Sequence, residues 1–132
     1  MPSSEGRSSP KGSQIVPKLK EKGPKRRSNC AVACTLDIIG DRWTMLIVRD
    51  LFRGYRRYND FLESPEGITT SLLADRLKRL ESQGLVKRKR YNKHPPRYEY
   101  ELTDKGRALG PVLKAVVEWG KANLAGTRAY SD

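Results

Sequence analysis

The sequence predicts a mainly α-helical domain with one small β-hairpin, and three observations lead to this fold class. Apolar residues recur at helical spacing in several segments between residues 30 and 124. Two short segments between residues 86 and 102 instead have the composition and alternation of strands. The chain of 132 residues is long enough for one domain and too short for two domains with separate cores.

A basic tail precedes the predicted domain. Residues 1–28 contain eight Lys or Arg and two Asp or Glu, and Ser, Gly and Pro fill most of the rest. Such a segment buries too little apolar surface to offset its ordering entropy, so we expect disorder there. The tail is either a solubilising leader or an arm that contacts phosphates or enters a minor groove. The folded domain should cover 29–126, followed by a short C-terminal tail, 127–132.

Two helices are expected at the start of the domain. Apolar residues at helical spacing fill 30–39, and Gly40 ends this pattern. Asp41 is placed to cap a second helix over 42–52, which Gly54 ends. Because this second helix is apolar almost all round, it should form the buried centre of the domain.

The next segment predicts two further helices joined by a turn. A short helix is expected over 57–63, and the Ser-Pro-Glu-Gly sequence of 64–67 is typical of a turn. Thr69 is a suitable N-cap for a longer helix over 69–83, which Gly84 ends. The apolar face of this helix carries Leu73, Leu77 and Leu80.

A projecting hairpin and a last helix complete the pattern. Residues 86–91 form a basic strand candidate and 97–102 a cleanly alternating one, while two prolines in 92–96 prevent ladder pairing there. Thr103 is expected to cap the last helix, in which Pro111 should cause a kink or set back the true start. The apolar stripe of that helix consists of Leu109, Val112, Leu113, Val116, Val117, Trp119 and Leu124.

This order of elements predicts a winged helix-turn-helix with about five helices and a two-stranded wing, 86–102. Such domains place the second helix of the motif, here 69–83, in the major groove of DNA. The formal net charge of +12 favours a polyanionic partner. The sequence therefore predicts a protein that binds double-stranded DNA.

The candidate DNA-binding side chains lie on the outer side of the helix 69–83, at the wing tip and at the start of the central helix. They are Arg42, Thr69, Thr70, Ser71, Ala74, Asp75, Arg76, Lys78, Arg79, Lys93, His94 and Arg97. On the helix, short or flexible side chains can reach base edges, and Asp75 is expected to accept a hydrogen bond from cytosine or to orient Arg76 or Lys78. At the wing tip, basic side chains are expected to meet phosphates or the minor groove.

Each of these assignments has a plainer alternative. The outer side of the helix 69–83 is alternatively a solvated amphipathic surface. The wing charges alternatively solvate a strand edge and prevent sheet aggregation. Arg42 either holds a phosphate near exposed backbone N–H groups or pairs with Asp41 or Asp37.

Cys30 and Cys34 are spaced to share one helix face, a geometry that is poor for a disulfide within one helix. Positive charge from Arg26 and Arg27 would favour a thiolate, so one interpretation of the pair is redox sensing. The alternative is two buried, inert thiols at a dimer interface. Two cysteines and His94 lack the number and spacing of metal ligands, so neither a metal nor another cofactor is expected.

Other functional classes have little support in the sequence. No apolar run approaches the roughly 18 residues that span a bilayer, and the N-terminus lacks a signal-peptide core. We therefore expect no membrane partner and a cytoplasmic location, in association with the nucleoid. The chain has one histidine and no Gly-rich phosphate loop or nucleophile elbow, so it is not expected to be an enzyme.

From Cys30 to about Asn123 the chain resembles the HxlR family of bacterial and archaeal winged-helix regulators, relatives of the MarR type. The matching stretches are 30–33, 36–43, 46–51, 67–69, 73–81, 84–86, 95–106 and 117–119. The resemblance implies a homodimer built by the first and last helices, control of a promoter and, in some members, a sensor cysteine at the position of Cys30. Candidate interface residues are Val32, Leu36, Leu113, Val116, Val117 and Trp119.

The chain departs from the common family pattern at three positions, and its basic tail is longer than the usual family leader. Ala31 stands where a proline is frequent, Cys34 where another residue is usual, and Asp75 where a neutral polar residue is common. The function predicted is a sequence-specific regulator that binds a pseudo-palindromic operator. An architectural or nonspecific DNA-coating protein is the alternative, and an RNA-binding module is a third class without an evident stacking sheet.

Overall fold

The computed structural model describes residues 26–129. The predicted basic tail, apart from 26–28, and the last three residues lie outside this part. The chain divides into two units, residues 1–34 and 35–132.

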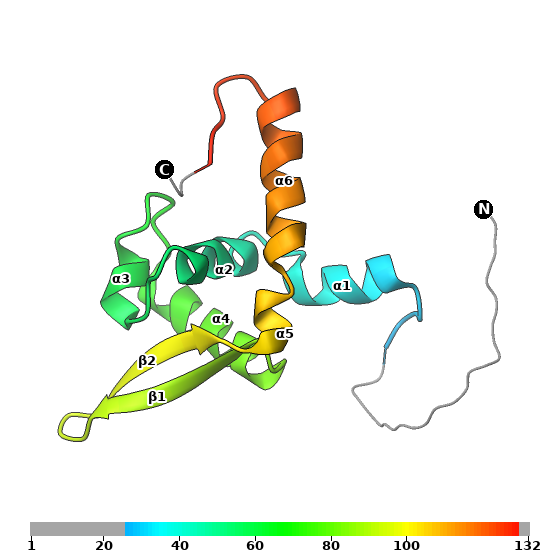
Figure 1. Cartoon of the computed structure of the whole chain (residues 1–132). Helices are drawn as coiled ribbons and strands as arrows, with labels where there is room; N and C mark the ends of the chain where they lie inside the picture. Colours follow the sequence, from blue (N-terminus) through cyan, green and yellow to red (C-terminus); the bar gives the residue numbers. More distant parts are fainter. Residues whose placement is uncertain (1–25, 130–132) are drawn as a thin grey trace. The chain divides into compact units, whose positions relative to one another are not determined.

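The order of elements confirms the predicted winged helix-turn-helix (Figure 1). The elements are α1 (Ala31–Ile39), α2 (Thr44–Phe52), α3 (Tyr58–Leu62), α4 (Thr70–Ser82), β1 (Val86–Asn92), β2 (Arg97–Leu102), α5 (Asp104–Arg107) and α6 (Gly110–Asn123). The five predicted helices are present, and the one-turn α5 is an addition, since the sequence predicted one continuous helix after Thr103.

Helix α2 begins two residues later than the sequence predicted, and its N-cap is Trp43 rather than Asp41. The Asp41 carboxylate accepts hydrogen bonds from the backbone N–H groups of Trp43 (3.0 Å) and Thr44 (3.1 Å). Asp41 therefore stabilises the turn that precedes α2 and the first N–H group of the helix, although it does not occupy the N-cap position. The prediction that α2 is buried holds for its inner side, whereas Phe52 is exposed.

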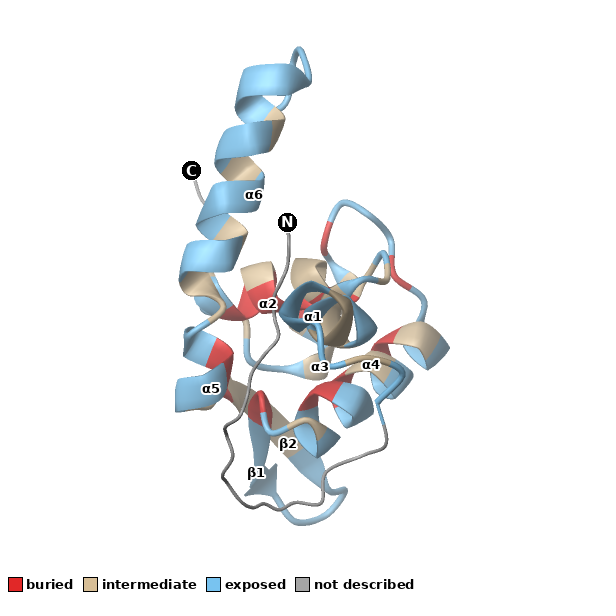
Figure 2. Cartoon of the chain, turned by 90° about the vertical axis from the view of Figure 1, so that its right-hand side faces the viewer, coloured by how far each residue is buried: buried red, intermediate tan, exposed pale blue. Residues whose placement is uncertain are grey.

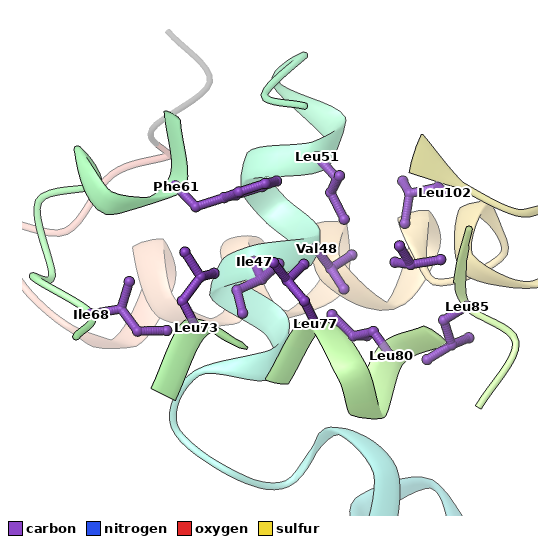
Figure 3. Packing of buried hydrophobic residues seen from close by; sticks show 11 residues of the cluster. Ile47, Val48, Leu51, Phe61, Ile68, Leu73, Leu77, Leu80, Leu85 and Leu102 are labelled. Carbon is purple, nitrogen blue, oxygen red and sulfur yellow. The ribbon is translucent and has the colours of Figure 1, made fainter. Parts of the chain in front are cut away.

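The core of the second unit lies where α2, α3 and α4 meet the base of the wing (Figure 3). It consists of Ile47, Val48, Leu51, Phe61, Ile68, Leu73, Leu77, Leu80, Leu85, Val86 and Leu102. The three leucines of α4 enter it from one face, as their spacing predicted. Each fully buried side chain of this size contributes about 1.5–3 kcal/mol. The leucine face of α4 is therefore the side that packs into the core.

The caps of α4 are those that the sequence indicated. The Thr69 hydroxyl accepts a hydrogen bond from the Leu72 N–H at 3.3 Å. Gly84 follows the helix with a φ of 75°, a left-handed conformation that glycine adopts without strain.

Strands β1 and β2 form the antiparallel wing. Val86 pairs with Leu102 at its base, and Asn92 pairs with Arg97 at its tip, after a register shift between Arg90 and Asn92. The two prolines lie in the connection, as predicted. A backbone bridge from Arg57 to Glu99 ties the segment before α3 to β2.

The last helix starts later than the sequence pattern alone suggested. Thr103 accepts a hydrogen bond from the Gly106 N–H at 3.1 Å, but it caps only the single turn of α5. Pro111 lies in the first turn of α6, so the proline sets back the true start of the helix, one of the two predicted effects. Every residue of α6, Gly110–Asn123, is exposed or half-buried (Figure 2).

Candidate nucleic-acid interface

Helix α4 exposes one side and buries the other (Figure 2). The exposed candidate residues are Thr69, Thr70, Ser71, Ala74, Asp75, Lys78 and Arg79. None of their side chains belongs to the core. This side is thus free of a packing role and carries short or flexible groups that fit a major groove.

An ion network crosses α4 and reaches the start of α2. The Arg76 guanidinium donates from Nε to Asp41 Oδ2 at 2.8 Å and from Nη1 to Asp75 Oδ2. The same Asp75 oxygen lies 3.1 Å from Arg79 Nε. Burial opposes ionisation of Asp41, but hydrogen bonds from Thr44 and Arg76 outweigh it and lower the pKa of Asp41 to about 2. The network therefore joins the outer side of α4 to the N-terminus of α2.

A second network fixes the turn between α3 and α4. Arg49 makes a bidentate pair with Glu66, with N···O distances of 2.9 and 2.8 Å. The buried Asp50 accepts hydrogen bonds from Arg49 Nε at 3.0 Å and from the Ser64 hydroxyl. These bonds connect the central helix to both sides of the turn. Sequence reasoning missed this network, and its only signal was an Arg-Asp pair inside an apolar helix.

Helix α3 is tied to the first turn of α4. The Tyr58 hydroxyl donates to the Thr70 carbonyl oxygen at 2.6 Å. The Asp60 carboxylate accepts from the N–H groups of Arg56 and Arg57, which caps α3. The geometry of the helix-turn-helix is therefore set by hydrogen bonds at its start, its turn and its second helix.

A groove of about 660 Å³ lies between α3 and the wing. It is lined by Arg57, Tyr58, Asn59, Asp60, Tyr91, Pro95, Pro96, Arg97, Tyr98 and Tyr100. The Arg57 guanidinium stacks on the Tyr91 ring at 4.0 Å and lies 3.1 Å from Glu99. The groove combines cationic and aromatic groups of α3 and the wing, and no pattern in the sequence indicated it.

The predicted basic residues of the wing are exposed. Lys93, His94 and Arg97 lie at its tip, and Arg42 is exposed before α2. Arg42 makes no ion pair with any residue in the described range. This leaves the guanidinium of Arg42 accessible, as a phosphate contact requires.

The cysteines belong to the first unit. Cys30 is exposed and immediately precedes α1, whose first N–H groups face it. Hydrogen bonds from the N–H groups of Ala33 and Val32 lower the pKa of the Cys30 thiol. Cys34 is half-buried, and its thiol donates to the Ser28 carbonyl oxygen at 3.1 Å. Both thiols are free.

The candidate dimer residues are mostly exposed. Val32 and Leu36 of α1 and Val116 and Trp119 of α6 are at least half exposed, while Leu113 and Val117 are half-buried. Leu113, Val116 and Val117 line an apolar groove of about 790 Å³ that α6 forms with α2 and the chain near Arg128.

Residues 26–129 contain no group of three His, Cys, Asp or Glu side chains that is placed to hold a metal ion. None of their helices has the length and apolar character to cross a membrane.

Comparisons with known proteins agree with this arrangement. Residues 38–128 match the family model of the HxlR-like helix-turn-helix. The HTH-type transcriptional regulator YybR of Bacillus subtilis is 37% identical over 104 residues, which cover 79% of this chain and 83% of YybR. MalR of Fusobacterium mortiferum, a regulatory protein by its name, is 35% identical over 75% of this chain and 94% of its own length.

Solved structures give the same result. The reduced form of the redox regulator HypR superposes with a TM-score of 0.66 at 37% identity, covering 71% of this chain and 93% of HypR. The reduced form of the regulator YodB from Bacillus subtilis gives 0.62 at 30% identity, covering 76% and 99%. The family model, the related sequences and the similar structures thus agree. The chain belongs to the HxlR-like helix-turn-helix family of DNA-binding transcriptional regulators, which are not enzymes.

Proposed function

We propose that this regulator binds a specific double-stranded sequence as a homodimer. Residues 69–83 enter the major groove, and the wing, 86–102, contacts the backbone or minor groove. The observation that carries the proposal is the two-sided character of α4, whose leucines are buried while its polar side chains face outward. This is the arrangement by which recognition helices present side chains to base edges.

The homodimer is supported by the apolar surface of α6. Val116, which lines the groove between α2 and α6, is 58% exposed, and Trp119, further along α6, is 63% exposed. A second copy of the chain supplies an apolar surface of the same kind, as a two-fold interface requires. Two recognition helices would then meet half-sites about one helical turn apart, in a pseudo-palindromic operator.

The exposed cations supply affinity. Arg42 lies before α2 and Lys93 and Arg97 lie at the wing tip, and all three are exposed. The exposed imidazole of His94 lies between the two wing residues and is a further candidate for a phosphate contact. Their contacts release counterions and add affinity without reading sequence.

The test is a selection from random duplexes with the full-length protein. A specific regulator enriches a pseudo-palindrome, whose half-sites are then confirmed by binding titrations at physiological salt. Recovery of no enriched sequence would instead favour an architectural or DNA-coating protein.

We also propose that Cys30 senses oxidants or electrophiles. Its exposed thiol at the start of α1 has a lowered pKa, which increases the reactive thiolate fraction near neutral pH. HypR, one of the similar structures, is described as a redox regulator. Treatment with diamide or a quinone should change operator binding by wild type and leave Cys30→Ser unaffected. An equal response in both proteins would remove this proposal and leave DNA binding intact.

A further inference from the structure

Two arginines on the recognition helix have different environments. The Arg76 side chain is only 14% exposed, and its guanidinium contacts both Asp41 and Asp75. The Arg79 side chain is 65% exposed, and its Nε lies 3.1 Å from Asp75. Within residues 26–129 the Arg79 guanidinium has no partner besides Asp75. The two side chains are therefore suited to different tasks.

Arg76 is committed to the protein. Its Nε and Nη1 are both used, and withdrawing it toward DNA would leave the half-buried Asp41 without its charged partner. The loss of a charge-assisted hydrogen bond of this kind is costly, so Arg76 stays in place and braces α4 against α2.

Arg79 keeps donors available. A guanidinium has five N–H groups, and one of them, on Nε, faces the Asp75 carboxylate. The two terminal nitrogens remain available and form a planar pair of donors. Because Asp75 restrains the side chain on its Nε side, fewer rotamers are lost when those donors bind.

The same arrangement accounts for an acidic residue, Asp75, on the surface that is proposed to face DNA. An acidic group on a DNA-facing surface repels phosphates, but this one lies between two guanidinium groups. With Asp41, which also contacts Arg76, the four side chains carry no net charge, and the exposed Arg79 guanidinium is the cationic group of the network that is open to a ligand. Guanine presents N7 and O6 as two neighbouring acceptors in the major groove, which match a pair of arginine donors.

We propose that Arg79 reads a guanine in each half-site and that Asp75 is the residue that positions it. Arg79 lies nine residues after the start of α4 at Thr70, roughly 13 Å along the axis. The proposal rests on the proposed function, since it names the residue that supplies part of the specificity.

The test uses the full-length protein and the duplex obtained by selection. Each guanine is replaced in turn by 7-deazaguanine, which lacks the N7 acceptor, and affinity is measured by fluorescence anisotropy. For wild type, one guanine in each half-site should cost roughly 5- to 150-fold in affinity. Arg79→Ala should bind more weakly and be indifferent to that replacement.

Two further variants separate positioning from charge. Asp75→Asn should reduce the sensitivity to the same guanine while affinity for an unrelated duplex stays or rises, because a negative charge is removed. Lys78→Ala, which removes a neighbouring exposed cation, should weaken binding overall but keep the wild-type ratio of affinities at that guanine. Circular-dichroism melting of all variants checks that the fold is kept, so a merely structural effect is recognised.

The possible failures are distinct. If Arg79→Ala weakens all duplexes equally and stays sensitive to every guanine that wild type reads, Arg79 contacts phosphate and the inference is wrong. If Asp75→Asn discriminates as wild type does, Asp75 does not position Arg79. If wild type enriches no sequence at all, the proposed function itself fails.

Discussion

Asp41 shows how a single carboxylate can serve two elements. Its bonds to backbone N–H groups at the start of α2 were predictable, because acidic residues just before a helix frequently accept such bonds. Its bond to Arg76 was not predictable, since the two residues are 35 positions apart and meet only when α4 packs below α2. Local chemistry follows from neighbouring residues, whereas partners distant in sequence require the packed fold.

The lowered pKa of Asp41 predicts a loss of stability in acid. A folded pKa of about 2, against an ordinary value near 4, means that the charged form stabilises the fold above pH 4. That contribution should disappear as the pH falls from about 4 to 2. Urea unfolding of Asp41→Asn should therefore show a shallower decline over this range than wild type. Asp104→Asn, at a fully exposed carboxylate, is the control and should retain the wild-type profile.

Cys30 and Cys34 should differ in reactivity. Cys30 is exposed and its pKa is lowered, while the half-buried Cys34 thiol is bonded to the Ser28 carbonyl. Limited treatment with iodoacetamide at pH 7.5 should therefore modify Cys30 first. Peptide mass spectrometry measures the two rates, and equal labelling would contradict the assignment.

At the scale of elements, the sequence was most informative where a helix has one buried side and recognisable caps. For α4, the leucine spacing, Thr69 and Gly84 gave both the boundaries and the orientation. For α2 and α6 the starts were displaced, because the turn after Asp41 and the one-turn α5 depend on how the chain packs. The groove beside the wing and the Arg49–Glu66 pair likewise could not be predicted from the sequence, since both join segments that are distant in sequence.

The one-turn α5 is packed closely against the start of the wing, which predicts the effect of a single methyl group. A Cβ added at the buried Gly106 would lie 2.1 Å from the Leu85 carbonyl oxygen. Gly106→Ala should therefore lower the free energy of unfolding by about 1–3 kcal/mol. Gly120→Ala, where a Cβ meets nothing within 4 Å, should leave stability unchanged or raise it by up to about 1 kcal/mol. Urea unfolding at one protein concentration compares them, and equal effects would exclude the packing argument.

We expect the protein to function as a homodimer. Trp119→Glu should place a charge in the apolar surface of α6 and produce monomers, since an unpaired buried charge opposes association. Sedimentation velocity at micromolar concentration measures the state, and operator binding should be lost together with the dimer. Glu118→Gln, at a neighbouring exposed position, is the control. A monomeric wild type would falsify the homodimer.

The net charge of +12 predicts a steep dependence of DNA binding on salt. The logarithm of the binding constant should fall with log salt by about 0.9 per phosphate neutralised. Removal of residues 1–27, which carry eight Lys or Arg, should flatten this slope if the tail contacts DNA. An unchanged slope would identify the tail as a solubilising leader.

The separation of α4 into a buried leucine side and an exposed polar side has a consequence for how such regulators diversify. Substitutions at Ser71, Asp75 or Lys78 change groups that the core does not contact. Operator preference can therefore shift while the free energy of unfolding is nearly constant. After gene duplication, one copy would be able to acquire a new target sequence through a few surface substitutions, without passing through an unfolded intermediate variant.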